Sequence, residues 1–271
     1  MSRRFPVFAV GLALFAIEAF PAFSQGLNFM SGESDTPIEV TADNGIEWDQ
    51  DGKIFTARGN ANAVQGDLKV ISDELRAYYR PKGGRAGGTD IWRLDAIGHV
   101  KIASPTETAT GDAAVYDIDK AVMVLTGKNV RYATSQDVIT ADRQIEYWEG
   151  QQMAVARGNA VATRSDRRLR ADVIVARFRS EKAGSKVYRV EAFDNVTIVT
   201  ATETVTAERA VYLLDTGIVT LAGAVKIVRG SNQLDGCSAE VNMRTGISKM
   251  TSCGDKSRVR GVLVPENVRK K

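Results

Sequence analysis

Residues 137–162 read DVITADRQIEYWEGQQMAVARGNAVA, and the fold of the chain follows from this stretch. Residues 138–141 lead into Ile145 and Tyr147, residues 149–152 form a polar turn signal, and a second apolar run returns past Gly158. Short runs rich in β-branched residues on both sides of a polar, Gly-containing turn are typical of two antiparallel strands. The stretch therefore predicts a strand-turn-strand unit.

Two landmarks of this unit recur along the chain. The first is a small residue followed by an acid, and the acids are Asp43, Asp73, Asp112, Asp142, Asp172 and Glu208, with Cys237 at the same place in a degenerate copy. The second is a Gly-centred phrase such as Ala-Arg-Gly-Asn-Ala, found at Gly59, Gly98, Gly127, Gly158 and Gly223, with Asp194 replacing Gly in one copy. Both series step by about 30 residues, apart from steps of 39 and 36 residues in each. A shared period marks a stacked array of about seven units, none of which buries its apolar face alone.

Loops explain the two long steps. Residues 82–88 are rich in Gly and fall within the 39-residue step, and residues 180–186 fall within the 36-residue step. Insertions in a stacked array occur at turns between strands, where extra length is tolerated. No segment after Ser24 has a long 3.6-residue periodicity, so we predict one all-β, solenoid-like domain over residues 37–254 and a basic C-terminal tail over residues 255–271.

The start of the chain has the features of a secretory signal peptide. Two arginines precede an apolar run at residues 5–20, and Ala22-Phe23-Ser24 supplies the small residues before a cleavage site. The alternative is a retained membrane anchor, but the run contains Glu18 and is short against the ~20 residues that span a bilayer. We therefore expect a cleaved signal peptide at residues 1–24, a mobile N-terminal segment at residues 25–36, and an exported mature protein.

Charge and histidine content exclude several functions. The formal net charge is +3, and it becomes +2 when Arg3, Arg4 and Glu18 leave with the leader. Acidic and basic residues are interspersed, which argues against a surface that binds nucleic acid. The one histidine, His99, occupies a place that Asn159 takes in another unit. We therefore expect His99 to be a surface strand position and not the base of a Ser-His-Asp triad, and a single histidine excludes the usual histidine-based zinc sites within this chain.

The recurring acids are the next candidates for chemistry, because they could form a ladder along one edge of the array. Calcium-binding repeats need a turn richer in Gly and Asp than any copy here. The repeat itself explains every acid of the series, so a pair of catalytic carboxyl groups in one cleft is not favoured either. We therefore expect no metal, no cofactor and no enzymatic activity.

The apolar side of the strands is the remaining candidate site. Its larger members are Ile38, Val40, Trp48, Phe55, Tyr116, Ile118, Tyr147, Phe178, Val196 and Tyr212. Small residues on the same strands would leave room between two facing sheets; they are Ala57, Ala61, Ala63, Ala114, Ala160 and Ala162. Two interpretations stay open: a filled core, as in a β-solenoid scaffold or adhesin, and an apolar groove that binds a ligand.

Three phrases of the sequence resemble the OstA-like family. They are IEVTAD at residues 38–43, YDIDKAVMVLTG at residues 116–127 and ARGNA at residues 156–160, and the resemblance covers roughly residues 36–250. The resemblance implies a β-jellyroll of two V-shaped antiparallel sheets, no catalysis, and an apolar groove through which lipopolysaccharide crosses the periplasm. Position by position, Ile38 and Val40 match a groove-lining strand of the family, and Tyr116 and Ile118 match a later one.

The same resemblance implies the partners. They are lipopolysaccharide, held by the acyl chains of its lipid A, an inner-membrane LptC-like protein, an outer-membrane translocon and further copies joined head to tail. A membrane-anchored LptC-like relative would share the fold, so it stays an alternative identity for the chain.

The two cysteines predict a disulfide. Cys237 and Cys253 are the only cysteines of a chain with an export signal. If residues 244–246 form a three-residue hairpin loop, Met243 pairs with Ile247, and the register then places the two cysteines directly opposite one another. The alternative is a pair of reduced thiols on opposite sheets.

Overall fold

The computed structural model describes residues 37–81, 88–181, 184–245, 247–254 and 257–264. The predicted signal peptide and mobile N-terminal segment lie outside these ranges, as do parts of the predicted C-terminal tail. Within the ranges, no helix has the length and apolar character needed to cross a membrane.

The part of the chain that the structure describes is built almost entirely from strands, which confirms the all-β prediction. One short 3-10 helix, η1 (Glu149–Gln151), interrupts them. The strands are β1 (Glu39–Thr41), β2 (Ile46–Asp49), β3 (Ile54–Gln65), β4 (Leu68–Pro81), β5 (Thr89–Ala103), β6 (Glu107–Asp117), β7 (Val122–Thr126), β8 (Val130–Thr134), β9 (Asp137–Ala141), β10 (Gln144–Trp148), β11 (Met153–Arg164), β12 (Arg167–Glu181), β13 (Gly184–Val199), β14 (Glu203–Leu213), β15 (Ile218–Arg229), β16 (Asn232–Asn242), β17 (Ile247–Thr251) and β18 (Arg260–Val262).

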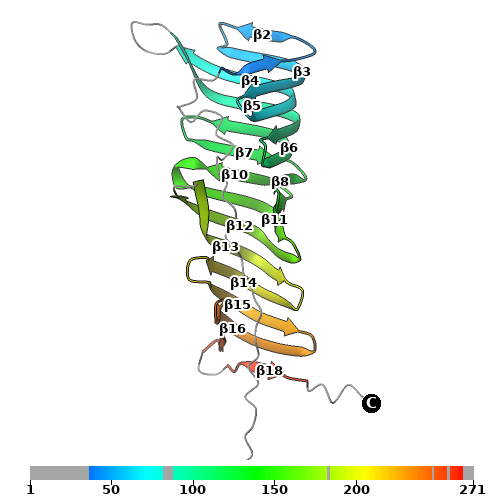
Figure 1. Ribbon diagram of the computed structural model, residues 1–271, viewed down its shortest axis with the longest axis vertical. Coiled ribbons are helices and arrows are strands. Elements are labelled where there is room, and N and C mark those ends of the chain that lie inside the picture. The colour runs from blue at the N-terminus through cyan, green and yellow to red at the C-terminus, as the bar shows by residue number, and fades with distance from the viewer. Residues whose placement is uncertain (1–36, 82–87, 182–183, 246, 255–256, 265–271) are drawn as a thin grey trace, which may run out of the picture.

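The strands form one antiparallel network of 18 members, stacked along the long axis of the molecule from the N-terminal to the C-terminal end (Figure 1). Each long strand contributes to two walls. The first wall contains β2, β7, β10 and β17 with the halves of the long strands that pair with them. The second wall contains β1, β8, β9 and β18 with the other halves. At both ends, therefore, two half-strands share one long strand.

The two sequence landmarks meet at the bend between the walls. Strands β3, β5, β11, β13 and β15 carry a bulge there, and the bulge coincides with the Gly-centred phrase. The residue after the Gly position also has a left-handed backbone, as at His99 (φ 47°) and Asn159 (φ 47°). A bulge bends a strand and increases its twist, so the repeated phrase repeats the bend.

The landmark acids bind these bulges from the neighbouring strand. Asp142 Oδ2 accepts a hydrogen bond from Asn159 Nδ2 at 3.1 Å, and Asp73 Oδ2 lies 2.8 Å from His99 Nδ1. Both series share one period because each acid and each bulge are partners in space. The hydrogen bond to Asp73 raises the pKa of the exposed His99, which therefore has a structural contact at the bend.

Glycine is needed at the bend for a steric reason. Gly98 has a φ of +78°, and a Cβ at this position would lie 2.1 Å from Asp73 Oδ2. Asp194 is the departure from this rule, and its φ of 61° is one that Asp adopts more readily than most residues.

The first predicted insertion, residues 82–88, falls between β4 and β5 as expected. The second prediction is wrong for its described residues. Ser180 and Glu181 belong to β12, and Ser185 and Lys186 belong to β13. These ends of the two strands pair with one another, so the extra length extends two strands.

The outer face of the first wall carries buried acids. Glu191 is 6% exposed, and it accepts hydrogen bonds from Arg189 (2.9 Å), Arg209 (3.2 Å) and Arg177 (3.3 Å). Burial raises the pKa of Glu191, but these arginines outweigh it and hold the pKa below its usual range. This face is therefore stabilised by paired charges, and the interior between the walls remains apolar.

Candidate functional site

Two apolar ladders face each other across the interior. On the first wall, successive register partners are Phe55, Ala77, Leu94, Tyr116, Met123, Tyr147, Ala154, Ala176, Val190, Tyr212, Val219 and Val241. On the second wall they are Val40, Ala63, Val70, Ile102, Ala109, Tyr132, Ile139, Ala162, Leu169, Ile198, Val205, Ile227 and Leu234. Because side chains alternate between the faces of a strand, each ladder presents one apolar row along the whole array.

The space between the ladders is only partly filled. A cavity of about 310 Å³, the N-terminal cavity, lies among β1 to β7, and a cavity of about 160 Å³, the C-terminal cavity, lies among β8 to β16. Small side chains such as Ala77 and Ala176 border them. A dry cavity of ~150 Å³ accommodates a ligand the size of benzene, so both spaces can take apolar chains.

Half of the residues predicted for the groove border the N-terminal cavity. They are Ile38, Val40, Trp48, Phe55 and Tyr116. Trp48 is 60% exposed at the end of the array, where its indole Nε1 donates a hydrogen bond to Tyr79 Oη at 2.7 Å.

The other predicted residues lie further along the interior. Tyr212 borders the C-terminal cavity. Ile118 packs against the apolar cluster of the N-terminal half, and Tyr147 packs against the clusters of both halves. Phe178 and Val196 are buried in the C-terminal cluster and border neither cavity, and the Phe178 ring meets Tyr147 edge-on at 6.4 Å.

A polar cluster lies between the two cavities, and the sequence did not predict it. Tyr116 of the first wall donates a hydrogen bond to Glu149 Oε1 at 3.0 Å, and on the second wall Tyr132 and Glu107 lie close enough for the Tyr132 hydroxyl to affect the pKa of Glu107. Burial raises the pKa of both carboxyl groups, and the tyrosine hydroxyls oppose this rise. The pKa of Tyr147 is raised mainly by burial and further by the negative charges of Glu149 and Glu107, so both acids affect the same tyrosine. These groups form a polar waist where the two halves of the array meet, because Tyr116 borders the N-terminal cavity, Tyr132 borders the C-terminal cavity and Tyr147 packs against the apolar clusters of both halves.

The open edge of the second wall carries a row of polar residues that point to the interior side. This polar rim contains Glu107, Thr134, Asp137, Arg164, Arg167, Thr200, Glu203, Arg229 and Asn232. Each of these residues lies two positions from a member of the second ladder on the same strand or just beyond its end, so its side chain points to the same side. An amphiphile with its tail between the ladders would place its polar end beside this row.

Glu203 is the most buried acid of the polar rim. Its side chain is 0% exposed, and Arg229 Nε lies 3.9 Å away. Burial raises the pKa of Glu203, and the charge of Arg229 opposes the rise. The alternation of the strand predicts an inward direction for this residue, but neither landmark marks it as unusual.

The ranges that the structure describes contain no candidate metal-binding group. No group of three or more His, Cys, Asp or Glu side chains could hold a metal ion there. The landmark acids instead hold the bends of the walls, as Asp142 and Asp73 do.

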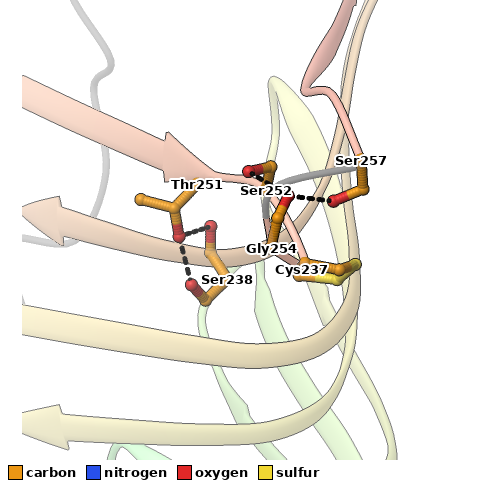
Figure 2. The surroundings of a disulfide bond; sticks show 7 residues. Cys237, Ser238, Thr251, Ser252, Gly254 and Ser257 are labelled. Carbon is orange, nitrogen blue, oxygen red and sulfur yellow. Dashed lines mark hydrogen bonds between the residues drawn. A yellow bond between two sulfur atoms is a disulfide. The ribbon is translucent and has the colours of Figure 1, made fainter.

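The disulfide between Cys237 and Cys253 is confirmed, with a Cα–Cα distance of 5.0 Å (Figure 2). The predicted register is wrong by one residue. Asn242, in place of Met243, pairs with Ile247, because Asn242 Oδ1 accepts hydrogen bonds from the backbone of Arg244 (3.0 Å) and Thr245 (3.1 Å) and closes a longer loop.

The bond therefore does not join directly opposed residues. Cys237 lies at the bend of β16, where a landmark acid lies in other units, and Cys253 follows the end of β17. Beside it, the hydroxyls of the cross-strand partners Ser238 and Thr251 are 2.5 Å apart (Figure 2). A covalent bond thus holds the last bend.

A comparison with protein-family models identifies the family of the chain. The family described as "LptA/(LptD N-terminal domain) LPS transport protein" matches residues 39–153 and 138–247. An uncharacterized protein of Rhizobium meliloti (strain 1021), R00383, is 28% identical over 142 residues, which is 51% of this chain and 75% of that protein. A crystal structure of LptH, described as the LptA homologous periplasmic component of the lipopolysaccharide transport device of Pseudomonas aeruginosa, aligns with 85% of this chain and 96% of its own at 12% identity and a TM-score of 0.21.

Proposed function

Because the chain belongs to the LptA/(LptD N-terminal domain) family of LPS transport proteins, we propose that it binds lipopolysaccharide by enclosing the acyl chains between its two apolar ladders. The observation that carries this proposal is the pair of ladders with unfilled space between them in both halves of the array. A filled scaffold would leave no such space.

The energetics of lipid transport favour an enclosed path. Each exposed methylene costs ~0.8 kcal/mol in water, so an acyl chain of about a dozen methylenes costs on the order of 10 kcal/mol. Walls made of Val, Ile, Leu and Ala offer no polar group along most of the interior, and a chain can therefore move from strand to strand without meeting a strong binding site. The polar waist at Tyr116 and Tyr132 lies between the apolar regions of the two halves.

The ends of the array suggest how it joins its partners in the periplasm. Half-strands β1 and β2 at one end and β17 and β18 at the other each pair along one edge only, within the part of the chain that the structure describes. Exposed apolar side chains accompany them, including Trp48 (60% exposed) and Ile247 (67% exposed). Edges of this kind add strands from other chains. We propose that one end meets an inner-membrane LptC-like protein and the other meets a further copy or an outer-membrane translocon, so that the groove continues between membranes.

Photocrosslinking with matched neighbours tests the binding proposal. A benzophenone amino acid at Tyr212 or Val40 faces a cavity, whereas the adjacent Val211 and Glu39 border neither cavity. The purified mature protein, incubated with lipopolysaccharide and irradiated, should form lipid adducts from Tyr212 and Val40 and not from Val211 and Glu39. Equal adduct yields at all four positions, or none, would refute enclosure between the ladders and favour a scaffold.

A charge in the groove gives a second test. Val40→Asp places a carboxylate beside the N-terminal cavity, where its burial is unfavourable without a partner. We expect weaker lipopolysaccharide binding than for Glu39→Asp, which changes the neighbouring outward residue. A folded Val40→Asp protein that binds as tightly as the wild type would remove Val40 from the groove.

A further inference from the structure

Three tyrosine rings occupy the interior halfway along the array. Tyr116 and Tyr147 belong to the ladder of the first wall, where Met123 lies between them, and Tyr132 belongs to the ladder of the second wall. Tyr116 and Tyr132 are both 5% exposed, so their rings are packed inside the array. The ladder members on either side of this group are aliphatic on both walls. Rings from both walls therefore occupy the levels of β6, β8 and β10.

The open space of the interior divides at this level. The N-terminal cavity reaches Tyr116 and Met123, and the C-terminal cavity begins at Tyr132 and Ile139. Among the residues that the structure describes, none borders both cavities. Each half of the array therefore has an apolar space of its own.

Polar groups lie beside the same rings. Tyr116 Oη donates a hydrogen bond of 3.0 Å to Glu149, which belongs to η1 between β10 and β11. On the second wall, Glu107 is 5% exposed and lies close to Tyr132. A hydrocarbon chain offers these groups no hydrogen bond, and burying a polar group without one is unfavourable. Acyl chains are therefore more stable within either cavity than across the tyrosines.

The family matches the chain twice, and the two matches meet at the same place. Residues 39–153 form the first match and residues 138–247 the second, so they overlap only at residues 138–153. Nearly all residues that border the N-terminal cavity lie in the first range, and nearly all that border the C-terminal cavity lie in the second. The overlap contains Tyr147 and Glu149. The chain thus contains two family units in tandem, with the tyrosines at their junction.

We propose that the chain holds two lipopolysaccharide molecules at once, one with acyl chains in the N-terminal cavity and one with acyl chains in the C-terminal cavity, with Tyr116, Tyr132 and Tyr147 as the boundary between the two sites. This inference rests on the proposed function and adds to it the number of bound lipids and the place where one site ends. A single continuous groove predicts a different result, which is one lipid whose acyl chains lie on both sides of the tyrosines.

Native mass spectrometry of the mature full-length protein with lipid A counts the bound lipids. We expect the wild type to saturate at two lipid A molecules per chain. Two filling variants address the sites separately, because Ala77 borders the N-terminal cavity and Ala176 borders the C-terminal cavity. Ala77→Trp and Ala176→Trp should each saturate at one lipid. The matched controls are Tyr78→Trp and Val175→Trp, at adjacent residues that border neither cavity, and both should still bind two.

Photocrosslinking on the two sides of the tyrosines locates the boundary. A diazirine amino acid at Met123 borders the N-terminal cavity, and one at Ile139 borders the C-terminal cavity. Ala77→Trp should lower the yield of lipid A adducts at Met123 by about tenfold or more, which corresponds to losing the burial of about two methylene groups. It should leave the yield at Ile139 unchanged. Ala176→Trp should have the reverse effect.

Thermal unfolding checks that each variant is folded. If tryptophan unfolds the protein, Ala77→Leu and Ala176→Leu make the same comparison with a smaller side chain. If the wild type binds no lipid A, the proposed function is wrong. If it saturates at one lipid A per chain, or if either filling variant abolishes the adducts at both positions, one lipid occupies both halves; lipid binding then stands and only the further inference fails. If a filling variant still binds two lipids, the cavity that it fills is not a lipid site, and the further inference fails as well.

Discussion

Removal of the disulfide should loosen the C-terminal end of the array and leave the rest intact. The perturbation is Cys237→Ser/Cys253→Ser, which preserves the size of both side chains. The two residues are 16 apart in sequence, and the chain-entropy estimate for a loop of this length is ~3 kcal/mol. In a stacked array each unit contacts only its neighbours, so this loss should act on β16, β17 and β18 and not on the whole protein.

Amide hydrogen exchange followed by mass spectrometry measures this locally. A loss of ~3 kcal/mol corresponds to roughly a hundredfold faster exchange, and we expect it in peptides from residues 232–251. Peptides from residues 68–117, which cover β4 to β6, should not change. The matched control is Ser238→Ala/Thr251→Ala, which removes the hydroxyl contact beside the bond and keeps the bond, and it should cost about 1 kcal/mol or less.

Two results would refute the reasoning. Unchanged exchange in residues 232–251 of the double variant, when the wild-type protein is oxidised, would mean that the bond does not hold the last bend. An equal increase in residues 68–117 would mean that the array unfolds as one cooperative unit, and the nearest-neighbour description would then be wrong.

Three further outcomes follow from the same structure. Glu203→Gln should stabilise the protein by about 1 kcal/mol at pH 7, because it removes a fully buried carboxylate. Burial raises the pKa of Glu203 above 4.5, so the cost of burying the charged carboxylate is absent below that pH and grows as the pH rises. The difference in thermal unfolding between variant and wild type should therefore vanish in acid, and a constant difference would contradict this. Gly98→Ala should lower the free energy of unfolding in urea by about 1 to 3 kcal/mol, because Gly98 has a left-handed φ and an added Cβ would clash with Asp73. Gly150→Ala should be tolerated, because a Cβ at that position meets nothing within 4 Å. Equal losses of stability in the two variants would refute the steric argument. Trp48→Glu should weaken concentration-dependent self-association in light scattering, and an unchanged profile would exclude the N-terminal end from the contact.

The groove residues show how far alternation alone can predict a site. Tyr116 and Tyr212 were assigned to the apolar side by strand parity, and both border a cavity. Phe178 and Val196 share the apolar side but lie in filled parts of the interior. Parity fixes which face of a strand a side chain occupies, but it carries no information about the distance between two walls, and that distance decides whether the space is packed or open.

In the hairpin of the last unit, the disulfide could be predicted from the sequence but the strand register could not. The cysteine content, together with a predicted export signal, was enough to predict the bond between Cys237 and Cys253. The loop was not predictable in the same way, because Asn242 competes for the backbone of the turn through its side chain and moves the pairing by one residue.

The sequence by itself determined the all-β class, the period of the array, the place of its first insertion and the disulfide, because these depend on local alternation, on turn residues and on two cysteines. Only the tertiary structure decided that landmark acids such as Asp142 hold the bends, that Glu107 and Glu149 both act on Tyr147, and that Arg164, Arg167 and Asp137 gather at one cavity. The physical reason is distance along the chain. These contacts join residues of different strands or different walls, and the angle at each bend, which no single strand encodes, sets their separation.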